Sequence, residues 1–202
     1  MPSMVELTYP LLTSRLCLRP FDGSRDVDDM HAYRGLPEAC RYVPFEPSTR
    51  EQIAERLASP RFVRSQLEFE GEALSLAIEH SGTGRLIGDV VLFWHSLDDR
   101  SGEIGYILHP DHHGHGYATE ACRALLGLAF EQVGLHRVTA EVDVRNPRSA
   151  AVARRLGMRE EGVRKAASWT KGEWVSYTVF ALLEDEWKTS LVGTSAHVPS
   201  GS

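Results

Sequence analysis

Cysteine, long apolar runs and excess positive charge are all scarce in this sequence of 202 residues. Cys17, Cys40 and Cys122 are far apart and outside any CxxC spacing, so we expect buried free thiols rather than a disulfide framework or a zinc knuckle. The strongest apolar stretch, 124–130, is much shorter than the roughly 20 residues that cross a bilayer, and the acidic, proline-bearing start does not resemble a signal peptide. We therefore expect a cytoplasmic protein without a membrane partner.

The charge balance is acidic, with 22 Lys and Arg against 28 Asp and Glu and a formal net charge of −6. A surface of this sign does not attract nucleic acid through phosphate charge, so we expect no nucleic-acid partner and consider an amine-bearing substrate more compatible. Hydrophobic residues make up 42% and charged residues 25%, which excludes a disordered chain, a collagen or a coiled coil.

No repeat and no Pro/Gly/Ser-rich linker divides the middle of the chain, which indicates one domain over residues 11–188. We expect residues 1–10 to be a flexible N-terminus. Residues 189–202 are small and polar, so they offer too little apolar area to offset the entropy of ordering, and we predict a disordered tail there.

Hydrophobic periodicity predicts a first half that is rich in strands. The segment 48–51 has the spacing of a capping box and predicts the start of a helix. Alternating apolar residues and turn signals predict strands at 15–20, at 74–78 and 86–94 as a hairpin, and at 103–108, where Pro110 ends the strand.

The second half begins with a glycine-bearing loop at 112–116 that opens a helix, and a strand follows at 135–144. This βαβ unit predicts two parallel strands, with the helix N-terminus beside the carboxyl end of the first strand. A helix is expected from Asn146 to Leu156, ended by Gly157, and then a closing antiparallel hairpin at 163–167 and 174–182.

The loop is a candidate anion site, because the first N–H groups of a helix lack partners and glycines let an anion approach closely. Gly114 and Gly116 lack the third glycine of a dinucleotide fingerprint, and no lysine follows as in a Walker loop. On this motif alone, a strand-to-helix turn without a ligand remains an equal alternative.

Further motifs accompany the loop in a fixed order. They are Arg15-Leu16-Cys17-Leu18-Arg19-Pro20, Glu103-Ile104-Gly105-Tyr106, His113-Gly114-His115-Gly116-Tyr117-Ala118-Thr119-Glu120-Ala121, Asn146-Pro147-Arg148-Ser149, Leu156-Gly157-Met158 and Glu186-Trp187. This set resembles the RimJ/RimL branch of the GCN5-related N-acetyltransferase (GNAT) family over residues 11–188, with His113 in place of the Gln or Arg that begins the family's loop. The resemblance implies an α/β (α+β) fold, namely a central mixed, mostly antiparallel sheet with a parallel βαβ cofactor-binding unit.

The resemblance also implies acetyl transfer from acetyl-CoA to a primary amine by direct attack in a ternary complex. The acceptor is then a peptide N-terminus or a small amine, and a homodimer is possible. The alternative is a non-catalytic acyl-CoA-binding module. The residues that the resemblance assigns to acetyl-CoA are Ile107, Leu108, His109, His113, Gly114, His115, Gly116, Tyr117, Ala118, Thr119, Asn146 and Ser149.

Two catalytic residues follow from the same resemblance. Glu103 is the expected general base, although a strand-end glutamate facing water is equally compatible with the sequence. Ser149 is the expected proton donor to the leaving sulfur, because Ala153 stands where many members have a tyrosine. The alternative role for Ser149 is a hydroxyl that caps the helix, and for Asn146 a plain Asn-Pro turn.

Other constellations are weighed against simpler explanations. His109, His112, His113 and His115 lack metal-ligand spacing, so we expect no metal site and expect protonated histidines to support phosphate binding instead. His95 is a candidate for the acceptor cleft, as are Trp169, Trp174 and Tyr177, which cross-strand packing explains equally well. Ser168 and Ser176 depart from acidic residues of the branch, which indicates an altered acceptor pocket.

Overall fold

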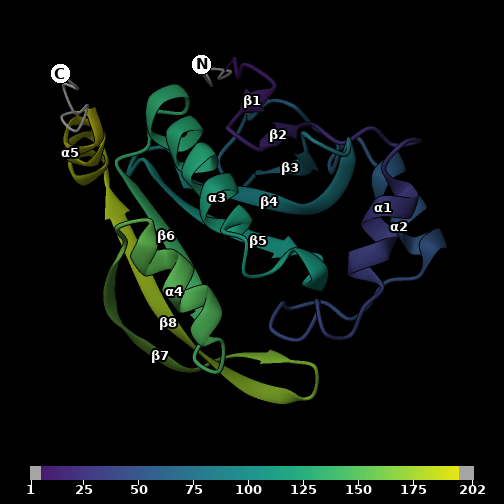
Figure 1. The fold of residues 1–202 in the computed structure, drawn as a ribbon. Coiled ribbons are helices and arrows are strands. Elements are labelled where there is room, and N and C mark those ends of the chain that lie inside the picture. Colours follow the sequence, from purple (N-terminus) through teal and green to yellow (C-terminus); the bar gives the residue numbers. More distant parts are fainter. Residues whose placement is uncertain (1–5, 196–202) are drawn as a thin grey trace, which may run out of the picture.

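The computed structural model describes residues 6–195 and has one mixed sheet of eight strands in the order β1-β2-β3-β4-β5-β6-β8-β7 (Figure 1). The strands are β1 Leu11–Leu12, β2 Leu16–Arg19, β3 Ala73–His80, β4 Arg85–Ser96, β5 Ser101–Leu108, β6 Arg137–Asp143, β7 Arg159–Thr170 and β8 Glu173–Leu183. The helices are α1 Val27–Arg34, α2 Arg50–Ala58, α3 Tyr117–Gly127, α4 Pro147–Arg155 and α5 Glu184–Ser195. All neighbouring strands are antiparallel except β5 and β6, as predicted.

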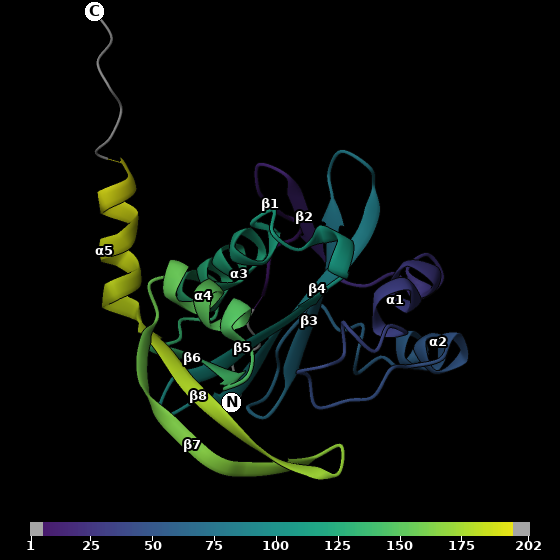
Figure 2. The ribbon, with the colours of Figure 1, turned by 60° about the horizontal axis from the view of Figure 1, so that its bottom comes forward.

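Helices cover both faces of the sheet. Helices α3 and α4 lie on one face (Figures 1 and 2), where Leu125, Val138 and Phe180 belong to the main apolar core. Helices α1 and α2 pack on the other face, where a second core joins Met30 and Ile53 to the sheet. We call these the α3/α4 face and the α1/α2 face. Because strand side chains alternate between faces, this assignment decides where each site residue points.

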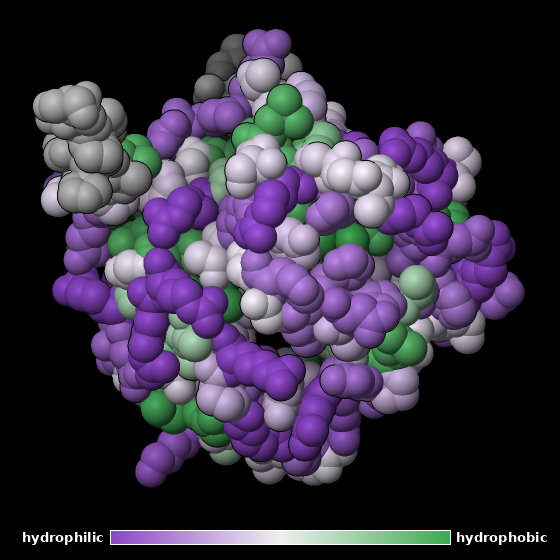
Figure 3. All heavy atoms as spheres, viewed as in Figure 1, coloured by the Kyte–Doolittle hydropathy of each residue, from purple (hydrophilic) through white to green (hydrophobic). Residues whose placement is uncertain are grey.

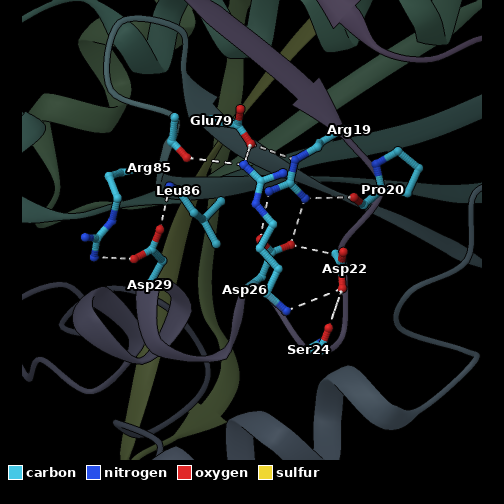
Figure 4. Close-up of polar contacts among 11 residues, drawn as sticks. Arg19, Pro20, Asp22, Ser24, Asp26, Asp29, Glu79, Arg85 and Leu86 are labelled. Atoms are coloured by element: carbon cyan, nitrogen blue, oxygen red, sulfur yellow. Dashed lines mark hydrogen bonds and ion pairs between the residues drawn. The ribbon is translucent and has the colours of Figure 1, made fainter.

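Helix α1 is attached to the sheet by buried charge. The Asp89 carboxylate on β4 accepts hydrogen bonds from the Tyr33 hydroxyl at 2.6 Å and from Arg34 Nη2 at 2.7 Å, and all three side chains are buried. At the start of α1, Arg19 bridges Asp26 and Glu79 (Figure 4). Buried charge is tolerated when it is paired in this way, so these ion pairs hold helix α1 in a fixed position over β2, β3 and β4.

The start of α2 differs by one residue from the predicted capping box. Thr49 rather than Ser48 is the N-cap, its Oγ1 accepts the Gln52 N–H, and the Gln52 side chain accepts the Thr49 N–H. Both ends of the domain also extend beyond the predicted limits. Leu7 is buried and its N–H donates to Gln66 Oε1 at 2.7 Å, and α5 continues the fold to Ser195, within the predicted tail. Residues 1–5 and 196–202 lie outside the described residues.

Cys40 and Cys122 are buried free thiols as expected, whereas Cys17 is half-buried. Among the helices between residues 6 and 195, none has the length and apolar character needed to span a bilayer.

Candidate active site

The sheet opens between β5 and β6. The parallel pairing covers only Ser101 to Glu103 on β5, which pair with Arg137 to Thr139, although β4 pairs with β5 as far as Leu108 and β8 pairs with β6 as far as Asp143. Beyond Glu103, β5 and β6 therefore separate, and their facing edges are no longer paired with each other. In the space-filling view a hollow lies between the end of β5 and the β7–β8 hairpin, beside the start of α4 (Figure 3).

Among the backbone amides of residues 107–109, only that of Leu108 faces this gap. The His109 N–H donates to the Ile87 carbonyl of β4 at 2.8 Å, and since successive peptide groups of a strand alternate in direction, the Ile107 N–H also points toward β4. Leu108 points the other way, and His113 Nε2 lies 3.3 Å from its carbonyl oxygen. The backbone N–H groups of Ile107 and His109 are therefore directed at β4, and that of Leu108 remains as a candidate donor to a ligand in the gap.

The glycine loop has the geometry of an anion site. Gly114 and Gly116 both have φ of +82°, a conformation that favours glycine, and a Cβ at Gly114 would meet no atom within 4 Å. Helix α3 begins at Tyr117 with Gly116 as its N-cap, and no side chain caps it. The first N–H groups of α3, at residues 117–119, therefore have no capping side chain and are oriented as donors to an anion.

The side chains around this loop hold its shape. The His115 ring stacks on Tyr117 with 5.6 Å between centroids, and Thr119 Oγ1 accepts a hydrogen bond from Arg155 Nη1 at 3.1 Å. Ala118 packs against the main core. The expected loop residues are thus together at the start of α3.

Arg15 is a site residue that the sequence reading missed. Its Nη1 donates to the His115 carbonyl at 2.9 Å, its Nη2 pairs with Glu120 Oε2 at 2.6 Å, and its guanidinium lies 4.6 Å from the Tyr117 ring centre. An unpaired Glu120 in the first turn of α3 would repel an anion bound there, and its position is the sequence signal from which a basic partner could have been expected.

The histidines of the loop do not form a metal centre. Between residues 6 and 195 there is no group of three or more His, Cys, Asp or Glu side chains that could hold a metal ion. The His112 ring stacks on His80 and meets His109 edge to face, and burial together with these two neighbours lowers its pKa. This lowered pKa makes His112 a weaker candidate than an unperturbed histidine for a positive charge near phosphate.

Glu103 lies at the point where β5 and β6 separate, on the α1/α2 face. His95 Nε2 is 3.3 Å from its Oε2, so the structure brings together two residues that the sequence reading considered separately. Burial raises the pKa of Glu103 and the hydrogen bond from His95 opposes that shift, whereas Glu141 raises the pKa further. A carboxyl group whose pKa is raised in this way is a stronger proton acceptor once ionised.

Ser149 lies on the opposite face, at the start of α4. Its N–H donates to Asn146 Oδ1 at 3.1 Å, so the capping role belongs to Asn146 and leaves the Ser149 hydroxyl available. Ser149 lowers the pKa of the Tyr106 phenol, which lies three residues after Glu103 on β5 and therefore on the other face. Burial raises the pKa of Tyr106 to about 12, so the phenol is protonated at pH 7.

The aromatic residues of the last hairpin divide between the two faces. Tyr177 is opposite Asp143 in the β6–β8 register, on the α1/α2 face, and its hydroxyl lies 2.8 Å from Ser168 Oγ. Trp169 and Trp174 pair edge to face at 5.4 Å, are 62% and 63% exposed, and point to the other face of the hairpin. Tyr177, and not the two tryptophans, therefore borders the face that carries Glu103.

A model of the acetyltransferase (GNAT) domain matches residues 15–159, a range that includes β5, the glycine loop and α4. The chain belongs to the GNAT family. The gap between β5 and β6 and the loop at the start of α3 thus lie inside the matched domain of a GNAT protein.

Individual relatives agree with this assignment. The N-acetyltransferase YnaD of Bacillus subtilis is 29% identical over 177 residues, which are 88% of this chain and 98% of YnaD. A GNAT-family acetyltransferase from Bacillus anthracis has a similar solved structure, with a TM-score of 0.76, 26% identity, and coverage of 88% of this chain and 100% of the other. Spermidine N-acetyltransferase from Vibrio cholerae, solved with CoA and spermine, shares the fold with a TM-score of 0.73, 22% identity, and coverage of 87% and 99%.

Proposed function

We propose that this GNAT protein transfers an acetyl group from acetyl-CoA to a primary amine, either a peptide N-terminus or a small amine, as a RimJ/RimL-like N-acetyltransferase. One observation carries the proposal. At the point where β5 and β6 separate, Glu103 stands on the α1/α2 face, and the Tyr106–Ser149 hydroxyl pair stands on the α3/α4 face. A proton acceptor on one side of an open gap and proton donors on the other are what an acyl transfer requires.

The residues present fit acetyl-CoA. The N–H groups at the start of α3 would bind its diphosphate, because Gly114 is open to solvent and Gly116 offers no competing cap. The Leu108 N–H and the Asn146 side chain would hold the pantetheine arm, and Arg15 beside Gly116 would neutralise the charge of Glu120 next to the diphosphate. When bound, acetyl-CoA supplies the acetyl group as a thioester, which the amine attacks directly.

Glu103 would remove a proton from the incoming ammonium, because only a neutral amine has the lone pair needed for attack. At pH 7 deprotonation costs about 1 kcal/mol for an α-amine with a pKa near 7.8, and about 4.6 kcal/mol for a lysine-like amine near 10.4. His95 would hold the carboxylate in place from the side remote from the gap.

Ser149 would donate a proton to the departing sulfur, whose pKa is near 8.5 if it resembles a cysteine thiol. Tyr106 would replace that proton, since Ser149 acts on the pKa of its phenol and the phenol is protonated at pH 7. The Ser149 hydroxyl is not needed to cap α4, because the Asn146 side chain caps that helix.

Release of free thiol from acetyl-CoA tests the proposal directly. Peptides, polyamines and aminoglycosides are supplied as acceptors, and CoA binding is measured by calorimetry. Thiol release with at least one amine supports the enzyme. Tight CoA binding without release for any amine supports the alternative of a non-catalytic acyl-CoA-binding module, and absence of CoA binding contradicts both.

A further inference from the structure

The α1/α2 face of the sheet carries a row of carboxylates. Glu103 pairs with Thr139 in the parallel register, so every second residue of β6 from Thr139 onward, Glu141 and Asp143, shares its face. Tyr177 lies opposite Asp143, and Glu173 precedes Tyr177 on β8 by an even number of residues, so Glu173 is on this face as well. A row of this kind would attract a substrate with several ammonium groups, provided that the carboxylates are unpaired.

Almost all of these carboxylates are paired with arginine. Glu141 pairs with Arg164 of β7, and Asp143 and Glu173 both pair with Arg145 at 2.7 Å. Burial would raise the pKa of Asp143, but the hydrogen bonds from Arg145 outweigh burial and hold that pKa below its usual value. Farther along the face, Asp89 pairs with Arg34 at 2.7 Å.

Glu103 is the exception. Of the carboxylates on the α1/α2 face of β4, β5, β6 and β8, within the described part of the chain, it alone has a histidine partner and no arginine within ion-pair distance. A guanidinium keeps its positive charge at every pH and forms two directed hydrogen bonds with a carboxylate, and no guanidinium is paired with Glu103 in this way. The face therefore presents one carboxylate without a guanidinium partner, at the point where the sheet opens, whereas Asp143 and Glu173 share Arg145.

The far end of the face is bordered by cations. Arg41 and Arg145 line a small pocket at the tip of the β7–β8 hairpin. Lys171 lines it too, and its Nζ donates to the Cys40 carbonyl at 2.5 Å, which joins the hairpin tip to the loop between α1 and α2. A second ammonium of a substrate that has its first at Glu103 would approach Arg164 or these cations rather than a free carboxylate.

We infer that the acceptor of this enzyme carries a single ammonium group, the one that is acetylated, and that the rest of the acceptor is neutral or anionic. This inference rests on the proposed function and specifies its substrate class. It also separates this chain from the structural neighbour solved with spermine, a polycation. A polyamine would have to displace Arg164 from Glu141 to find its second anionic partner.

Matched acceptors test the inference. Two tripeptide amides that differ only by norleucine or lysine at the second position have nearly the same shape and differ by one ammonium, as do pentylamine and 1,5-diaminopentane. For the pair that is turned over, we expect kcat/KM to be at least tenfold higher for the acceptor with one ammonium. Spermidine is expected to be a poorer substrate than both members of that pair.

The Arg164→Gln variant tests the cause. Removal of the guanidinium leaves Glu141 unpaired, so kcat/KM for the dicationic acceptor should rise and the preference should fall at least threefold. Arg154→Gln is the matched control, because Arg154 pairs with Glu160 between α4 and β7 on the other face, and its preference should equal that of the wild type.

The possible failures are distinguishable. A wild type that turns over the dicationic acceptor or spermidine faster than the acceptor with one ammonium overturns this inference and leaves the acetyltransferase function standing. An unchanged preference in Arg164→Gln overturns the role of the Glu141–Arg164 pair. If no amine releases thiol, the proposed function fails, and the substrate class fails with it.

Discussion

Replacement of Glu103 by glutamine tests the general base by its dependence on pH and on the acceptor. Glutamine keeps the size of the side chain and a hydrogen bond to His95, but it cannot accept the proton. A positioned general base contributes about 10²- to 10⁴-fold, so kcat/KM at pH 7 should fall within that range. The variant then depends on acceptor that is already neutral, and its pH optimum should move upward.

The size of the loss should depend on the acceptor. At pH 7 about one in seven α-amines with a pKa near 7.8 is neutral, compared with about one in 2,500 lysine-like amines. The loss of kcat/KM in Glu103→Gln should therefore be smaller for an α-amine and should shrink as the pH approaches 9. The assay is thiol release followed from pH 6 to pH 10 with one acceptor of each kind.

The thermal stability of the fold provides a second readout, because the substitution that lowers activity is expected not to lower the melting temperature. Burial raises the pKa of Glu103 above its value in the unfolded chain, so the stability linked to this group is present at low pH and is lost as the pH rises through the folded pKa. Above the folded pKa the ionised Glu103 therefore destabilises the fold relative to its neutral form, and Glu103→Gln should keep or raise the melting temperature there. Glu160→Gln, on the other face, is the control and should leave the pH profile of kcat/KM unchanged. A wild-type pH profile of kcat/KM in Glu103→Gln refutes the assignment of Glu103 as the general base.

Three further predictions concern the loop, the proton donor and the buried charge. Gly116→Ala should raise KM for acetyl-CoA about tenfold, because an L-residue at φ +82° costs about 1–2 kcal/mol, and acceptor KM should not change; an unaltered acetyl-CoA KM contradicts the loop assignment. Ser149→Ala should lower kcat at least tenfold with no change in melting temperature, since Asn146 caps α4, and a lower melting temperature with normal kcat would indicate a structural hydroxyl. Asp89→Asn should destabilise the fold by about 3–5 kcal/mol in urea denaturation because it leaves Arg34 buried and unpaired, and a loss below about 1 kcal/mol contradicts that pairing.

The local features of the site were predictable from the sequence. The strand at 103–108, the glycine loop and the helix that follows depend on alternation, on glycine at positive φ and on helical periodicity, all of which act over a few residues. The parallel pairing of β5 with β6 followed because a helix separates them. The family resemblance of the ordered motifs agreed with the matched GNAT domain.

What the sequence could not provide was the partner of each group. Arg15 reaches the loop from 100 residues away, and the fold rather than any local motif brings Glu120 to it. His95 meets Glu103 across a shift in the β4–β5 register, and a register is set by the packing of whole strands. Alternation showed that Glu103 and Tyr106 point to opposite faces, but only the tertiary structure showed which helices cover each face.

The sequence by itself thus determined the elements and the residue types at the gap, because both are encoded over short distances. The tertiary structure decided which charges are cancelled. A carboxylate attracts an ammonium only if no guanidinium lies beside it. The arginines beside Glu141 and Asp89 are brought there by strand register and helix packing, whereas Arg145 is only two residues from Asp143.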